Sequence, residues 1–90
     1  MVSKEEVFKD DVLRVTNGIA ELLISKNQKY GNAALDPKRI FSRADSAEQI
    51  KVRIDDKLSR IANQNLEDDE DVIQDLIGYL VLLKISQQKS

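Results

Sequence analysis

Apolar residues recur at the spacing of an α-helix over the first third of the chain. They alternate four and three positions apart, as one face of an amphipathic helix requires, and are Phe8, Val12, Val15, Ile19 and Leu22. Ser3, with Glu6 three positions later, forms a capping-box pattern that predicts the start of this helix. The segment Tyr30-Gly31-Asn32 supplies a stop. We therefore expect a long helix that ends at about Asn27 or Lys29.

A second amphipathic segment follows the middle of the chain. Its apolar positions are Ile50, Ile54, Leu58 and Ile61. Ser46 and Gln49 form another capping-box pattern, which predicts a helix from Ser46 to about Asn63. At about 100° per residue, three basic residues lie beside the apolar stripe and border the core: Arg53, Lys57 and Arg60.

The last segment is apolar on nearly every face from Val72 to Ile85. This pattern predicts a central, largely buried helix, capped by Asp68 or Asp69 and ending at about Ser86. In the connection of residues 31–45, Asp36-Pro37 predicts one short helical turn over residues 38–41. The expected fold is a single all-α domain over residues 1–90, with three long helices and one short one. Gly18 and Gly78 lie inside two of these helices, where Ala would be the better helix former. We expect Gly18 to permit a close contact with another helix. At Gly78 either a helix or a ligand could approach, and we favour the helix.

The composition narrows the classes of function. Hydrophobic residues make up 41% of the chain and charged residues 33%, as in an ordinary folded protein. The net charge of −2 gives no global attraction to a nucleic-acid polymer or a membrane. The absence of Cys and His excludes disulfides, thiolate metal sites, zinc hydrolase chemistry and a histidine base. With no apolar signal region and no run of about 20 apolar residues, we expect a cytoplasmic protein.

Charge is unevenly distributed in the second half of the chain. Residues 38–60 carry seven Lys or Arg against four acids, whereas residues 61–75 carry six acids and no base. In an antiparallel hairpin of the last two long helices, the two groups would meet. They would form either a structural ion-pair network or a polar pocket for phosphates. Asp71 and Asp75, one helical turn apart, could also supply half of a Mg²⁺ site.

Three motifs in a fixed order resemble a known family. They are Lys29-Tyr30-Gly31, then Arg53-Ile54-Asp55-Asp56-Lys57-Leu58-Ser59-Arg60, then Glu70-Asp71-Val72-Ile73-Gln74-Asp75-Leu76-Ile77-Gly78-Tyr79. Over about residues 20–85 the chain resembles the phage nucleotide modification associated domain. That family is similar to the all-α nucleoside triphosphate pyrophosphohydrolases of the MazG and dimeric dUTPase type. If the chain is phage-encoded, the compartment would be the host cytoplasm.

The enzymes of that type hold Mg²⁺ with an ExxE motif and an ExxD motif on two helices. By this resemblance Asp55 or Asp56 matches the start of the first motif, but its second acid is replaced by Ser59 or Arg60. Asp75 matches the start of the second motif, but Gly78 replaces its second acid. About half of the metal ligands are therefore missing. The remaining candidates for Mg²⁺ are Asp56, Asp71 and Asp75.

The resemblance implies a nucleotide ligand that is bound by basic and aromatic side chains. The candidates are Lys29, Tyr30, Arg39, Arg43, Arg53, Lys57, Arg60 and Tyr79. The leading hypothesis is a protein that binds or sequesters a nucleotide without turnover, for example a cyclic signal of antiphage defence. The alternatives are a Mg²⁺-dependent pyrophosphohydrolase and a structural or adaptor helical module. Under all three, uncovered apolar surface predicts a homo-oligomer.

Overall fold

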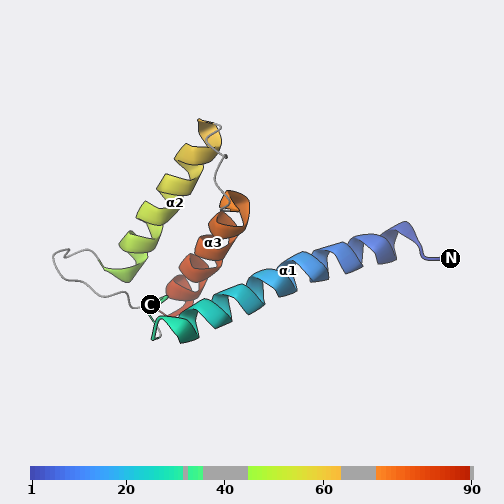
Figure 1. Ribbon diagram of the computed structural model, residues 1–90, viewed down its shortest axis with the longest axis horizontal. Coiled ribbons are helices and arrows are strands. Elements are labelled where there is room, and N and C mark those ends of the chain that lie inside the picture. Colours follow the sequence, from blue (N-terminus) through green and yellow to red (C-terminus); the bar gives the residue numbers. More distant parts are fainter. Residues whose placement is uncertain (32, 36–44, 64–70, 90) are drawn as a thin grey trace.

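Three helices account for most of the residues that the structure describes. The structure is a computed structural model and describes residues 1–31, 33–35, 45–63 and 71–89. These contain α1 (Lys4–Lys29), α2 (Ser46–Ala62) and α3 (Val72–Lys89), and no strand (Figure 1). The expected all-α fold is confirmed, while the predicted turn at residues 38–41 lies outside the described residues. No helix in the described ranges has the length and apolar character needed to cross a membrane.

The ends of α1 are those that the sequence predicts. The backbone N–H of Glu6 donates to Ser3 Oγ at 3.1 Å, so Ser3 caps the first turn. The helix ends at Lys29, and the N–H of Tyr30 donates to the carbonyl of Lys26 at 3.0 Å. Gly31 follows with a φ of 65°, a conformation in which a side chain would be strained. The chain therefore turns sharply away just after Tyr30.

The starts of α2 and α3 differ from the prediction. Asp45 caps α2, because its Oδ1 accepts the N–H of Glu48 at 2.8 Å. The predicted cap at Ser46 is therefore wrong by one residue. Asp71 caps α3 in the same way and accepts the N–H of Gln74 at 2.9 Å. This helix also extends to Lys89, three residues beyond the predicted end.

The core lies mainly in the hairpin of α2 and α3. The two helices run antiparallel and make most of the contacts between helices (Figure 1). Ile50 and Ile54 of α2 and Val72 of α3 are buried there. The C-terminal half of α1 packs across α3, where Ile19 is buried.

The two glycines behave differently. A Cβ added to Gly78 would lie 3.2 Å from Leu23 Cδ2, so α1 crosses α3 at this glycine, as expected. At Gly18, by contrast, no heavy atom of the described residues outside the helix lies within 4 Å of such a Cβ. The expected close contact at Gly18 is therefore not made within the chain.

The helix α3 is central but not largely buried, which corrects the prediction from its apolar sequence. Only Val72 and Gly78 of this helix are buried, whereas Ile73, Leu80 and Val81 are exposed. The reason is that α3 has two neighbouring helices in the described chain. One of these, α1, contacts α3 only through its own C-terminal half. The other half of α1 projects away from the hairpin (Figure 1).

Candidate functional site

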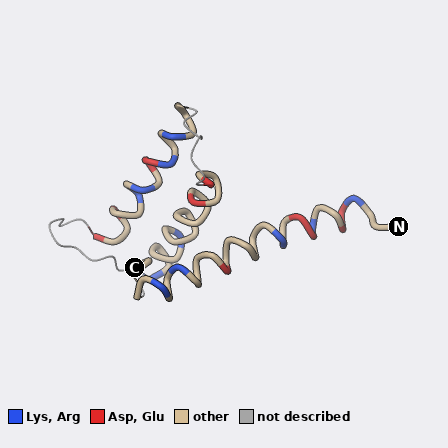
Figure 2. Tube along the Cα trace, viewed as in Figure 1, with Lys and Arg blue, Asp and Glu red and all other residues tan. Residues whose placement is uncertain are grey.

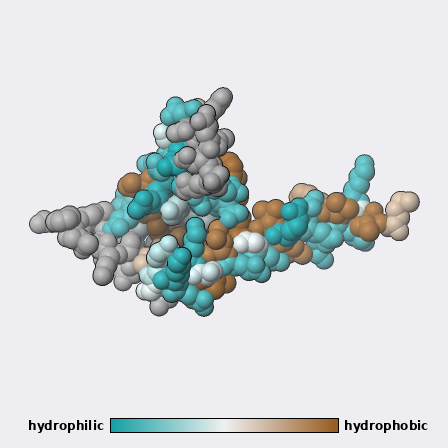
Figure 3. Space-filling view, viewed as in Figure 1, coloured by the Kyte–Doolittle hydropathy of each residue, from teal (hydrophilic) through white to brown (hydrophobic). Residues whose placement is uncertain are grey.

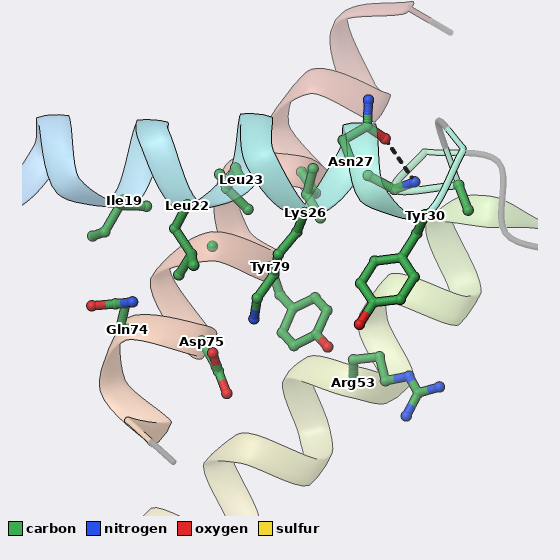
Figure 4. A pocket seen from close by; sticks show the side chains of 14 residues that line it. Ile19, Leu22, Leu23, Lys26, Asn27, Tyr30, Arg53, Gln74, Asp75 and Tyr79 are labelled. Carbon is green, nitrogen blue, oxygen red and sulfur yellow. Dashed lines mark hydrogen bonds between the residues drawn. The ribbon is translucent and has the colours of Figure 1, made fainter. Parts of the chain in front are cut away.

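A pocket of about 440 Å³ lies where the three helices meet (Figure 4). Its walls include apolar side chains of α1 and α3, among them Ile19, Leu22 and Leu82. Its polar lining comes from all three helices and consists of Lys26, Asn27, Tyr30, Arg53, Gln74, Asp75 and Tyr79. The mixture of apolar walls and a few polar groups is typical of small-molecule sites.

Helical periodicity places these polar groups in facing rows. Lys26 and Tyr30 are four residues apart and share one face at the end of α1, and Asp75 and Tyr79 do the same on α3. Figure 4 shows Lys26, both tyrosines and Asp75 pointing into the space between the helices. Arg53 of α2 stands at the edge of this space. Two phenol rings and two cations, which come from the end of α1 and from α2 and α3, thereby line one pocket.

The connection after α1 is tied to the rim of the pocket. The N–H of Ala34 donates to Asn27 Oδ1 at 3.1 Å, seven residues back along the chain. Ala33 and Ala34 also line the pocket. This bond fixes the Asn27 side chain, so that its amide group lies at the pocket wall in a defined position.

A buried ion pair lies beneath the polar side of the pocket. Lys57 Nζ lies 3.4 Å from Asp75 Oδ2, and the two side chains are 8% and 17% exposed. The pair joins the basic stripe of α2 to the acidic start of α3. Figure 2 shows Lys and Arg positions along α2 and acidic positions at the start of α3. For Lys57, this contact favours the interpretation of a structural ion pair over that of a ligand-binding residue.

The other predicted basic residues are dispersed. Lys29 Nζ lies 5.8 Å from the centre of the Tyr30 ring, within cation–π range. Arg60 Nε lies 3.7 Å from Asp56 Oδ2, one turn away on α2. Neither residue lines the pocket. Arg39 and Arg43 lie outside the described residues. Of the eight predicted ligand-binding residues, the pocket brings together Tyr30, Arg53 and Tyr79.

The three predicted metal ligands lie in different surroundings. Asp71 caps α3, Asp75 pairs with Lys57, and Asp56 is close to Arg60. Among the residues that the structure describes, no group of three or more acids is placed to hold a metal ion.

Lys26, Asn27 and Gln74 also line the pocket and were not among the predicted site residues. A signal for Lys26 was present. The apolar stripe of α1 ends at Leu22, and the next position of its four-and-three spacing is Lys26. A cation that continues an apolar stripe is a candidate to lie beside the neighbouring helix or at the edge of a cavity. Asn27 and Gln74 carried no comparable signal.

Comparison of the chain with models of protein families, with curated proteins and with solved structures found no match. The function is therefore inferred from the residues and the volume of the pocket.

Proposed function

We propose that the protein binds a nucleotide in the pocket between α1, α2 and α3 and releases it unchanged. The observation that carries this proposal is the convergence of two tyrosine rings with Lys26 and Arg53 in one pocket. Its volume of about 440 Å³ falls within the range of sites for small organic ligands. The combination of rings and cations matches a ligand that carries both a planar base and phosphates.

Each group in the pocket has a role in this proposal. Tyr30 and Tyr79 offer faces on which a base stacks, an interaction worth about 1–3 kcal/mol for each base. The Arg53 guanidinium and the Lys26 ammonium donate charge-assisted hydrogen bonds to phosphate oxygens. The side-chain amide of Gln74 supplies a donor and an acceptor for the edge of the base, while Asn27 holds the N–H of Ala34 at the rim.

The charges in the pocket favour an anionic ligand. Among the described residues, Asp75 is the acid that lines the pocket, and the Lys57 ammonium group already compensates its carboxylate. Lys26 and Arg53 then leave a local excess of positive charge in a chain whose net charge is −2. An anion entering the pocket would replace water around these cations rather than compete with an acidic wall.

Binding without hydrolysis is the version that the described residues support better. A metal-dependent pyrophosphohydrolase needs several carboxylates around its metal, and the described residues contain no such group. We propose sequestration of a nucleotide signal as the use of this binding. The resemblance to phage nucleotide-modification domains suggests a cyclic signal of antiphage defence as one such ligand.

Isothermal titration with a panel of linear and cyclic nucleotides tests the proposal. At least one nucleotide should bind at micromolar Kd, with equal affinity in EDTA, and should be recovered intact by chromatography. Arg53→Ala and Tyr79→Ala should each weaken binding at least tenfold, which corresponds to about 1.4 kcal/mol. Tyr79→Phe keeps the ring and should bind nearly as well as the unaltered protein.

Lys84→Ala is the matched control, because Lys84 is an exposed cation of α3 outside the pocket lining. Its affinity should equal that of the unaltered protein. The proposal fails if no nucleotide of the panel binds more tightly than about millimolar. It also fails if Lys84→Ala weakens binding as much as Arg53→Ala does.

A further inference from the structure

The first half of α1 carries an apolar face that nothing in the described chain covers. All of residues 4–18 are exposed. Phe8 is 70% exposed, Val12 42% and Val15 47%. The space-filling view shows hydrophobic residues along this projecting helix (Figure 3). The same stripe continues into the second half of α1, where Ile19 is only 6% exposed because it packs against α3.

The bare half of this stripe has the geometry of a helix-pairing surface. Its alternating four-and-three spacing is a 3.5-residue repeat, which is the narrow seam through which two helices pack. The seam is short, since residues 4–18 span about 22 Å. Isolated helices of about 15 residues are only marginally stable in water. Residues 4–18 continue a helix whose second half is already packed, and packing of this first half against another surface would stabilise it further.

The chain exposes more surface than a compact monomer of its mass, and the projecting half of α1 contributes to this excess. The accessible area is 7537 Å², whereas a compact monomer of 10.2 kDa exposes about 5,300 Å². The Cα radius of gyration is 15.6 Å, against about 12 Å for a compact chain of this length. The excess area of about 2,200 Å² is more than the 800 Å² or so that each partner buries in a standard interface.

The charges that flank the seam fit a second copy of this chain. Residues 4–14 carry three basic and four acidic side chains in a mixed order, so two copies repel each other little. This mixture also offers no single sign of charge to attract a strongly charged partner. In an antiparallel pair the two helix dipoles would also point in opposite directions, which is their favourable side-by-side arrangement. Isologous pairing is the commonest way in which such a surface is covered.

We propose that the α1 seam, formed by Phe8, Val12 and Val15, pairs antiparallel with the seam of a second copy across a two-fold axis. The proposal concerns a surface outside the pocket and does not depend on nucleotide binding. Ile19 marks the end of the seam, because beyond it the stripe is already covered by α3.

Sedimentation velocity of the full chain at micromolar concentration tests the pairing. The unaltered protein should sediment with at least twice the monomer mass, and Val12→Asp should reduce it to the monomer. Val52→Asp is the matched control, because Val52 is an apolar residue of α2 that is 64% exposed and remote from the seam. This control should keep the mass of the unaltered protein.

A second measurement does not rely on disrupting the interface. The chain has no cysteine, so Val12→Cys introduces a single thiol at the seam and Val52→Cys one on α2. Under mild oxidation Val12→Cys should form a covalent dimer much faster than Val52→Cys. A monomeric unaltered protein, equal rates of cross-linking, or an oligomer that survives Val12→Asp would each overturn the proposal.

Discussion

At the scale of single residues, Lys57 is the most constrained charge in the described structure. It is the one polar residue among the buried residues described, and its ammonium group faces Asp75 on the neighbouring helix. Burial of two charges costs solvation free energy that their attraction only partly restores. The pair therefore fixes how α2 and α3 align more than it adds to their stability.

We predict that Asp75→Asn lowers the free energy of unfolding by about 3 kcal/mol, because it removes a charged partner of the buried ammonium. The double variant Lys57→Met/Asp75→Leu, which replaces both charges by apolar groups, should lose much less than the sum of the losses of Lys57→Met and Asp75→Leu made singly. Urea denaturation of the single and double variants measures both quantities. Additive losses would show that the two side chains do not interact.

The sequence identified the members of this pair and left two roles open for them, an ion-pair network or a polar pocket for phosphates. Lys57 was predicted beside the apolar stripe of α2, which is where it lies. Whether such a lysine turns toward a ligand or toward an acid depends on which residue of the next helix stands opposite. That information is tertiary, and spacing within one helix does not contain it. The same limit explains why Asn27 and Gln74 were missed.

At the scale of the elements, helix caps determine where each helix begins. The Ser3 cap of α1 was predictable because no competing acceptor precedes it near the first turn. At α2, Asp45 and Ser46 are adjacent and both residue types are favourable caps. The structure selects Asp45, whose carboxylate also suits the positive end of the helix dipole.

We predict that Asp45→Ala lowers the free energy of unfolding by about 1 kcal/mol, because the N–H of Glu48 loses its acceptor. Ser46→Ala should change it by only a few tenths, since Ser46 is the first residue inside the helix. Thermal unfolding followed by circular dichroism compares the two variants. A larger loss for Ser46→Ala than for Asp45→Ala would restore the original prediction of the cap.

At the scale of the whole molecule, the sequence predicted the helices better than their packing. The apolar stripe of α1 is uniform from Phe8 to Leu22, yet α3 covers only its second half. Likewise, the apolar sequence of α3 predicted burial that the described single chain does not supply. Periodicity shows which face of a helix avoids water, but the covering partner lies elsewhere in the chain or on another copy.

We predict that amide hydrogen exchange responds to the loss of pairing in residues 4–18 but not in α2 and α3. In the unaltered protein at micromolar concentration, the amides of residues 4–18 should be protected by pairing. In Val12→Asp they should exchange quickly, because an unpaired helix of this length is marginal. The amides of α2 and α3 should keep their protection in both proteins. Unchanged protection of residues 4–18 in Val12→Asp would contradict this division.

The helix α1 belongs to the pocket at one end and to the bare stripe at the other. Within one continuous helix each residue advances the azimuth by about 100°. A single residue inserted or deleted near Gly18 would therefore rotate Lys26 and Tyr30 relative to Phe8 and Val12 by that angle. Such a change would alter the composition by only one residue and would leave the helicity and every local cap in place. It would nevertheless prevent both faces from engaging at once, so the residue count of α1 is constrained as tightly as its side chains.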